Sequence, residues 1–389
     1  MTTQLSLLER QFTLHRWPLD QKNRTLQAWD AADEYLINYI EDNGLKTPQT
    51  RILLINDSFG ALCCWFADNP LFNFGDSYVA HQAAIYNLNN NGLAIDDDSI
   101  HNPKPQQLSS LSELPDDIDL VLIKVPKNNG YLEFILSQLS QRLKPGTPVI
   151  AAAKTTDIHN STSALFGRYI GETSTSLAKK KSRLILSSQS QPAQSCAFPK
   201  QWPLEGTHFA LINHANVFSR DSLDIGARLL MANLPNHTDN LNVIDLGCGN
   251  GVIGLCLLAK SAQTQLQFVD ESYMAVASAK AAIEHNLPEQ LAQCQFTVDD
   301  CLTGQPNDSV DLILNNPPFH QQQAVTDHIA WQMFKDARRV LKVGGKLIIV
   351  GNRSLAYHTK LKRLFGNCQT LDSNKKFSVL SAQKTSHKG

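Results

Sequence analysis

The sequence predicts an α/β protein with two tandem Rossmann-like domains from an internal duplication, each with a mainly parallel sheet and helices on both faces. Two observations carry this prediction. Short apolar runs alternate with helical patterns along the 389 residues, which is typical of parallel strands joined by helices. The same order of elements also occurs twice, once in each half of the chain.

The repeat consists of three pairs of similar segments. In each half, an apolar run comes first and ends in a turn that contains glycine. A Ser-Tyr pair with an alanine-rich helix follows, and then a second apolar run that begins with Asp-Leu. The paired ranges are 51–57 with 241–247, 73–92 with 267–286, and 117–127 with 309–319. Self-similar order and spacing indicate a duplicated domain.

The division between the halves falls in a polar segment. Residues 187–203 are rich in Ser, Gln and Pro, which is the composition of a linker or surface loop. We therefore predict one domain over residues 1–194 and a second over residues 195–389.

Composition predicts a cytoplasmic protein. The net charge is −1, and no run approaches the roughly 18 apolar residues that a membrane span requires. Glu9 and Arg10 stand where a signal peptide would have its apolar core. The eight cysteines form no Cys-x-x-Cys pair and do not cluster with histidine at metal-ligand spacing, so we expect neither a membrane segment nor a metal.

A glycine-rich turn in the second half is the strongest sign of a cofactor. Residues 243–255 read VIDLGCGNGVIGL, an apolar strand that enters a turn with three glycines and then a helix. Glycine is needed where the backbone adopts positive φ or approaches a ligand closely. Asp270 ends the next apolar run, where an acid can accept hydrogen bonds from ribose hydroxyls. An adenosyl cofactor, a nicotinamide dinucleotide and a plain tight turn all remain open from this segment alone.

The segment Asn316-Pro317-Pro318-Phe319 decides among them. It follows an apolar strand, and in a doubly wound sheet that strand lies beside the glycine turn. The Asn316 side-chain oxygen and the Pro317 carbonyl can each accept one N–H of a planar amine, which directs the nitrogen lone pair toward a methyl donor. The prolines hold both acceptors in place before reaction, and Phe319 offers a face on which a base can stack.

These motifs resemble those of a known family. VIDLGCGNG together with NPPF is the pattern of class I S-adenosylmethionine methyltransferases that act on planar amino groups. With residues 217–230 (VFSRDSLDIGARLL) and NNPPFH, the chain looks like the ribosomal RNA guanine-N2 methyltransferases, and it is most similar to their large-subunit member. The resemblance spans nearly the whole chain. It implies S-adenosyl-L-methionine as cofactor and N2 of a guanine in 23S rRNA as substrate, with residues 195–389 as the catalytic domain.

The resemblance also implies a role for each matching residue. At the cofactor these are Phe218, Ser219 and Asp221 near its methionine end, Asp245, Gly247, Gly249 and Asn250 in the loop beneath it, Asp270 at the ribose, Asp299 or Asp300 at the adenine, and Asn316. At the target amine they are Asn316, Pro317, Pro318 and Phe319. The sequence does not separate Asp299 from Asp300.

Other functions fit parts of the same pattern. N2 of a 16S rRNA guanine, N6 of adenine, N4 of cytosine and a protein glutamine amide all present a planar NH2 to the same acceptors. A nicotinamide oxidoreductase leaves Asn316-Pro317-Pro318-Phe319 without a role. A non-catalytic RNA-binding or assembly factor would bind RNA but not the cofactor.

The first half departs from the pattern at both motifs. It has Asp57-Ser58-Phe59-Gly60 in place of the three-glycine turn, and Lys124-Val125-Pro126-Lys127 in place of the amine acceptors. We therefore expect a degenerate methyltransferase-like domain that has lost catalysis and binds RNA. Lys124, Lys127 and Asn128 are candidate RNA contacts, with ordinary loop residues as the alternative. A chain that carries its own RNA-binding half has no evident need to dimerise, so we expect a monomer.

Overall fold

The computed structural model describes residues 3–19, 26–93, 105–219, 222–318 and 323–386. The chain divides into two compact units, Met1–Phe198 and Pro199–Gly389. The boundary predicted from the sequence, between residues 194 and 195, lies in the extended segment just before this division.

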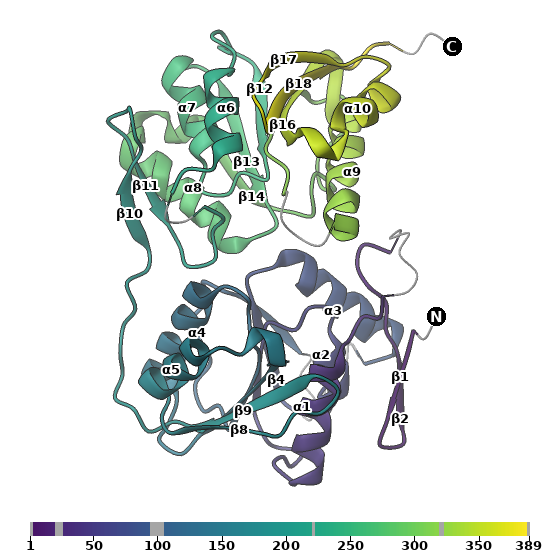
Figure 1. The fold of residues 1–389 in the computed structure, drawn as a ribbon, viewed down its shortest axis with the longest axis vertical. Coiled ribbons are helices and arrows are strands. Elements are labelled where there is room, and N and C mark those ends of the chain that lie inside the picture. The colour runs from purple at the N-terminus through teal and green to yellow at the C-terminus, as the bar shows by residue number, and fades with distance from the viewer. Residues whose placement is uncertain (1–2, 20–25, 94–104, 220–221, 319–322, 387–389) are drawn as a thin grey trace. The chain divides into compact units, whose positions relative to one another are not determined.

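The N-terminal unit, purple to teal in Figure 1, is built on a seven-stranded sheet within the described residues, and its strand order is β5-β4-β3-β6-β7-β9-β8. Its first five strands are parallel, and β9 and β8 return antiparallel. A separate hairpin pairs β1 (Gln4–Leu7) with β2 (Arg10–Thr13). The sheet strands are β3 (Ile52–Ile55), β4 (Leu71–Gly75), β5 (Gln106–Ser109), β6 (Leu120–Lys124), β7 (Pro148–Lys154), β8 (Thr173–Thr175) and β9 (Ser182–Ser188), and the helices are α1 (Ala31–Asp42), α2 (Ala61–Trp65), α3 (Tyr78–Asn90), α4 (Asn129–Arg142) and α5 (Asn160–Tyr169).

The C-terminal unit has a sheet of order β14-β13-β12-β15-β16-β18-β17, again parallel over its first five strands. A short hairpin, β10 (Lys200–Pro203) with β11 (Ala210–Asn213), precedes it. The sheet strands are β12 (Asn242–Leu246), β13 (Gln265–Asp270), β14 (Cys294–Val298), β15 (Val310–Asn315), β16 (Leu341–Asn352), β17 (Gln369–Ser373) and β18 (Phe377–Gln383), and the helices are α6 (Ile225–Ala232), α7 (Val252–Lys260), α8 (Tyr273–Asn286), α9 (Gln323–Val340) and α10 (Tyr357–Phe365). The prediction of two mainly parallel sheets with helices is confirmed.

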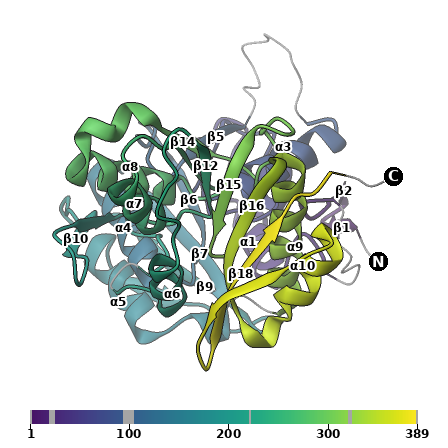
Figure 2. The same cartoon turned by 90° about the horizontal axis from the view of Figure 1, so that it is seen from above.

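Alternation of buried side chains places helices on both faces of the C-terminal sheet. Figure 2 shows α6, α7 and α8 on one face and α9 with α10 on the other. Val243 of β12 packs toward the first group, with Leu257 of α7, whereas Ile244 packs toward the second, with Phe334 of α9. All four side chains are at most 2% exposed. Burial on two faces explains why these strands read as continuous apolar runs.

Strand register fixes which loops meet at the end of the sheet. Leu246, the last residue of β12, lies opposite Val269 of β13 and Asn315 of β15. The turns after these three strands therefore open at one edge, where ligands bind in open α/β sheets. None of the helices that the structure describes combines the length and the apolar character needed to span a bilayer.

Gly251 shows why glycine is required where α7 begins. Its φ is +76°, and a Cβ there would lie 2.8 Å from Ala279 Cα. We expect Gly251→Ala to lower the free energy of unfolding by at least about 2 kcal/mol, since a left-handed backbone and overpacking each cost about 1–3 kcal/mol. The matched control is Gly249→Ala, because Gly249 also has positive φ (+54°) but no described atom within 4 Å of the added Cβ. Urea unfolding without cofactor measures both; equal losses would show that the contact with Ala279 contributes nothing.

Candidate active site

The glycine turn (residues 247–251) forms the floor of the candidate site. Gly247, Gly249 and Gly251 all have φ between +54° and +76°, a region that favours glycine. The turn is tied to the next strand, because the N–H groups of Gly247 and Cys248 donate to the Val269 carbonyl at 2.8 and 3.0 Å. A ligand can therefore approach the backbone at Gly249, where no described side chain stands in the way.

Asp270 joins this turn to the following helix. Its Oδ2 accepts a hydrogen bond from the Gly249 N–H at 2.9 Å, and its Oδ1 accepts one from the Ser272 N–H at 3.0 Å. The residue is half-buried at the end of β13. These two bonds hold the Asp270 carboxylate at the edge of the sheet, next to the glycine turn.

Asp245 and Asn250 lie deeper than a surface loop would place them. Asp245 is 2% exposed, and its Oδ2 accepts a hydrogen bond from the Gly254 N–H in the first turn of α7 at 2.9 Å. Burial raises the pKa of Asp245 to about 8, and the nearby charge of Asp270 adds to the shift. Asn250 is 5% exposed, and its Oδ1 accepts from the Val252 N–H at 3.3 Å. Both side chains therefore stabilise the start of α7 by accepting hydrogen bonds from its first N–H groups.

The structure distinguishes Asp299 from Asp300, although both are buried. Asp299 closes its own turn: Oδ1 accepts from the Asp300 N–H and the Thr303 hydroxyl, at 2.8 and 2.6 Å. Its Oδ2 accepts from the Gly304 N–H at 2.9 Å. Asp300 instead accepts from Nε2 of Gln332, on α9, at 2.9 Å. Asp299 therefore shapes the turn that presents Asp300.

Asn315 and Asn316 divide two tasks at the end of β15. Asn315 is fully buried, and its Nδ2 donates to the Leu246 carbonyl at 2.7 Å, which fixes this strand end beside the glycine turn. Asn316 Nδ2 donates to Asp224 Oδ2 at 3.4 Å. Like Asn315 Oδ1, Asn316 Oδ1 is buried and has no hydrogen-bond partner within the described part of the chain. Buried oxygens without partners are costly, so this acceptor fits a donor from a ligand.

The remaining predicted residues have different outcomes. Pro317 is buried and Pro318 half-buried, next to Asn316, while Phe319 lies outside the described residues. Asp221 also lies outside them. Ser219 has a left-handed φ of +54°, and Phe218 is 55% exposed.

Asp224 is a site residue that the sequence analysis missed. It is the N-cap of α6, and its Oδ2 accepts from the Ala227 N–H at 2.9 Å. An aspartate directly before an apolar helical pattern is a recognisable helix start, and that signal could have placed it there. Its contact with Asn316, 92 residues away, depends on tertiary structure.

In the N-terminal unit, Lys124 stands in the place of Asn316, and its side chain forms ion pairs within the fold. Lys124 Nζ lies 2.7 Å from Asp30 Oδ1 and 2.7 Å from Asp33 Oδ1, and the lysine side chain is 13% exposed. Burial lowers the pKa of Lys124, but the two carboxylates outweigh this and hold it above its usual value. Asn128 Oδ1 caps α4 by accepting from the Gly130 N–H. Lys124 and Asn128 are thus engaged within the fold while Lys127 is exposed, and RNA contact by these residues stays a prediction.

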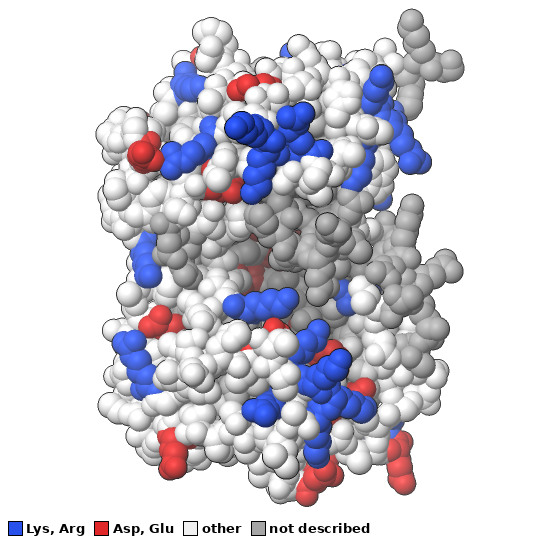
Figure 3. Space-filling model, in the orientation of Figure 1, with Lys and Arg blue, Asp and Glu red and all other residues white. Residues whose placement is uncertain are grey.

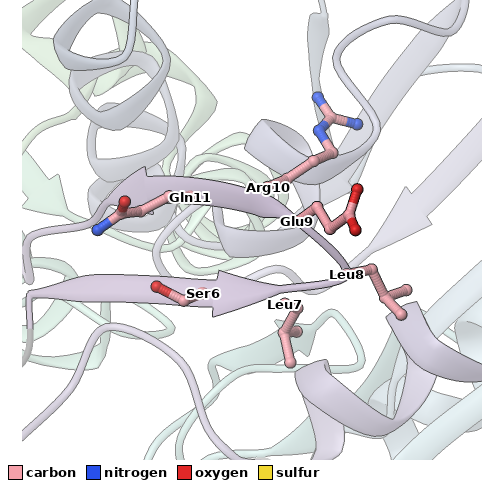
Figure 4. A pocket seen from close by; sticks show the side chains of 6 residues that line it. All are labelled: Ser6, Leu7, Leu8, Glu9, Arg10 and Gln11. Carbon is pink, nitrogen blue, oxygen red and sulfur yellow. The ribbon is translucent and has the colours of Figure 1, made fainter.

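A hollow at the N-terminal hairpin is unrelated to this site. Figure 4 shows it lined by Ser6, Leu7, Leu8, Glu9, Arg10 and Gln11, none of which is a predicted site residue. Within the ranges that the structure describes, no group of three or more His, Cys, Asp or Glu side chains is placed to hold a metal ion.

Comparison with known proteins assigns each half to a family. Residues 2–193 match the RLMG N-terminal domain, and residues 208–381 match the Methyltransferase small domain. The chain is 57% identical over 387 residues to the ribosomal RNA large subunit methyltransferase G of Pseudoalteromonas translucida, covering 99% of each chain. It is 51% identical over 390 residues to the protein of that name from Aeromonas hydrophila, covering 99% of this chain and 100% of the relative.

A solved structure shares the two-unit fold. It is a T. thermophilus 16S rRNA N2 methyltransferase (RsmC) in complex with AdoMet and guanosine, with a TM-score of 0.74 and 20% identity over 98% of this chain and 97% of that one. The class I methyltransferase fold predicted for this chain is thereby confirmed. The separate family model for residues 2–193 means that the two halves do not match one common domain family.

Proposed function

This chain belongs to the ribosomal RNA large subunit methyltransferase G family, and we propose that it transfers a methyl group from S-adenosyl-L-methionine to N2 of a guanine in 23S rRNA. The observation that carries this proposal is the buried Asn316 Oδ1, which lacks a described partner and stands beside the glycine turn. An acceptor in that place suits the N–H donors of an exocyclic amine. The methyltransferase family match favours an adenosyl cofactor over a nicotinamide dinucleotide.

The residues at the sheet edge fit this cofactor. The Asp270 carboxylate would accept hydrogen bonds from the ribose hydroxyls, the open side of Gly249 leaves room for the ligand, and Asp300, in the turn after β14, would bind the adenine. When bound, the cofactor supplies a methyl group activated by its sulfonium. Asn316 Oδ1 and the Pro317 carbonyl accept the two N–H groups of the amine and orient its lone pair. The guanine has to leave its base stack to reach them, because Pro317 is buried.

Radiolabelled methyl transfer tests the proposal. Wild-type protein is incubated with protein-free 23S rRNA, with 16S rRNA and with intact subunits, and the product is analysed as nucleosides by mass spectrometry. N2-methylguanosine in 23S rRNA is the expected result, and the RNA form that accepts label names the substrate. Label in 16S rRNA or in another nucleoside would show that the substrate differs from the proposed one. Cofactor binding without label in any RNA would favour a protein glutamine amide as substrate, or a non-catalytic assembly factor.

Asp299 and Asp300 give a matched pair for the cofactor site. We expect Asp300→Ala to weaken binding of S-adenosylhomocysteine about ten-fold or more, because a hydrogen bond to a charged group contributes about 1.5–3 kcal/mol, and to lower stability less than Asp299→Ala does. Asp299→Ala should instead destabilise the protein, since three donors in its own turn lose their acceptor. Calorimetric titration and thermal unfolding measure the two effects. The reverse pattern would assign the adenine contact to Asp299.

The N-terminal unit has the features of a duplicated domain that no longer binds the cofactor. Both sheets follow one strand order, and Gly60 begins α2 as Gly251 begins α7, with φ of +80° and +76°. The register places Gly75 at the end of β4 where Asp270 ends β13. These correspondences support an internal duplication, with residues 1–194 as the degenerate copy and residues 195–389 as the catalytic one.

We assign RNA binding to exposed basic side chains on both units. In the C-terminal unit, Arg353, Lys362 and Arg363 are exposed in or beside α10, and Figure 3 shows Lys and Arg side chains over that unit. In the N-terminal unit, Lys127 is the exposed one of the three candidates, since Lys124 and Asn128 are engaged within the fold. Phosphate contacts of this kind make RNA affinity fall with salt.

A further inference from the structure

The contact between Asp224 and Asn316 suggests how the site selects one orientation of the asparagine. We propose that Asp224 is a positioning residue that holds Asn316 with Oδ1 toward the target amine and Nδ2 away from it. This inference rests on the proposed function, because it concerns the group that binds the amine. Asp224 itself lies behind Asn316 and touches neither substrate nor cofactor in the proposal.

The two ends of a carboxamide have nearly the same shape but opposite hydrogen-bonding character. Packing alone therefore selects poorly between them, and a neighbouring group of one character has to decide. An ionised carboxylate only accepts hydrogen bonds, so Asp224 Oδ2 requires the NH2 end of Asn316, at 3.4 Å. With Nδ2 held there, Oδ1 faces away and remains buried without a partner among the described residues. The reversed amide would set N–H donors against the donors of the amine.

Asp224 is itself held in place by the helix that it caps. The oxygen that contacts Asn316 also accepts the Ala227 N–H at 2.9 Å, which anchors the carboxylate to the first turn of α6. That turn is fixed in the core, because Ala227 is 3% and Leu230 0% exposed. The acceptor is thus in position before substrate arrives, which is the condition for effective orientation of a binding group.

The N-terminal unit shows the same arrangement with a different partner. Asp30 caps α1 and receives Lys124 Nζ from the end of β6, as Asp224 caps α6 and receives Asn316 Nδ2 from the end of β15. In both units the acid at the helix start selects a donor from the strand end. In the C-terminal unit the donor is one end of an amide, so this selection directs the other end, the acceptor Oδ1, toward the proposed ligand.

A cap-preserving variant separates positioning from helix stability. Serine caps α8 in this chain, where Ser272 Oγ accepts the Ala275 N–H at 3.0 Å, so Asp224→Ser keeps a good N-cap. Its hydroxyl is shorter and both donates and accepts, so it no longer demands the NH2 end of Asn316. We expect kcat to fall about ten-fold or more, with the KM for S-adenosylmethionine and the unfolding midpoint near wild type.

An exchange of the two side chains gives the second readout. Asn316→Asp alone sets two carboxylates against each other, so its kcat should be low and should depend on pH, as expected for facing acids that share a proton. Asp224→Asn/Asn316→Asp restores a donor at 224 and an acceptor at 316. We expect the double variant to be at least ten-fold more active than Asn316→Asp, with the added pH dependence removed.

All variants are assayed beside wild type with labelled S-adenosylmethionine, 23S rRNA and nucleoside analysis. Wild-type kcat in Asp224→Ser, or a double variant no better than Asn316→Asp, would reduce Asp224 to a helix cap and overturn the proposal. Wild-type label in another nucleoside would overturn the proposed substrate alone, and recovery in the double variant would still support Asp224. Wild-type protein that methylates no RNA would overturn both.

Discussion

Asn316→Ala is expected to lower kcat for RNA methylation by about 10²–10³-fold, which corresponds to about 2.7–4 kcal/mol for loss of one preorganised acceptor. The alanine removes a buried side-chain oxygen that directly follows β15 and has no partner among the described residues; the buried Asn315 Oδ1, also without a described partner, stays in place. The amine would then keep only the Pro317 carbonyl, and its lone pair would no longer be directed. Cofactor affinity should fall far less than kcat, because the contacts assigned to Asp270 and Asp300 remain when the cofactor contact implied for Asn316 is lost.

Single-turnover methylation with saturating S-adenosylmethionine measures this effect, and calorimetry with S-adenosylhomocysteine checks cofactor binding. The neighbouring Asn315→Ala is the matched control. Asn315 Nδ2 donates to the Leu246 carbonyl, so its loss should appear first as reduced stability. Near-normal turnover in Asn316→Ala with intact cofactor binding would contradict the mechanism.

The fold could be predicted from the sequence because its strands and turns are marked by local patterns, namely apolar runs and glycines. The apolar runs that become β12 and β15 lie inside a sheet covered on both faces, and the glycines stand where the backbone has positive φ. The order of elements in each half was sufficient to predict the parallel sheets. Tandem Rossmann-like units were predicted for the same reason, whereas their common origin stays a proposal that rests on matching strand order and register.

The site was harder to predict where tertiary contacts decide a side chain's role. A sequence pattern places Asp245 in the loop, but only the fold shows that its carboxylate accepts from the Gly254 N–H below the loop. Asp299 and Asp300 are adjacent and chemically identical, so only their partners distinguish them. Lys124 reads as an exposed cation, yet Asp30 and Asp33, some 90 residues earlier, pair with it. Asp224 was missed because its partner Asn316 is 92 residues away.

Asp245 should make the stability of the ligand-free protein fall as pH rises. Its pKa is raised from 3.8 to about 8, mainly by burial, so the folded state retains a proton that the unfolded state releases. Below pH 4 both states hold the proton and the contribution is complete. Between about pH 4 and pH 8 the unfolded chain gains charge freely while the folded chain does not, and the contribution decreases by up to about 1.4 kcal/mol per pH unit. Above pH 8 both states are ionised and the decrease ends.

The variant Asp245→Asn isolates this group from the other buried acids. Its amide oxygen can still accept the Gly254 N–H, and it does not titrate. Urea unfolding of both proteins at pH 5, 6, 7, 8 and 9 gives the difference in free energy, which removes titrations that the two proteins share. We expect that difference to shift in favour of the variant from pH 5 to pH 8 and then to level off. A difference independent of pH would mean that Asp245 is ionised in both states from pH 5 to pH 9, so that hydrogen bonds such as the one from the Gly254 N–H outweigh burial, and it would contradict the raised pKa.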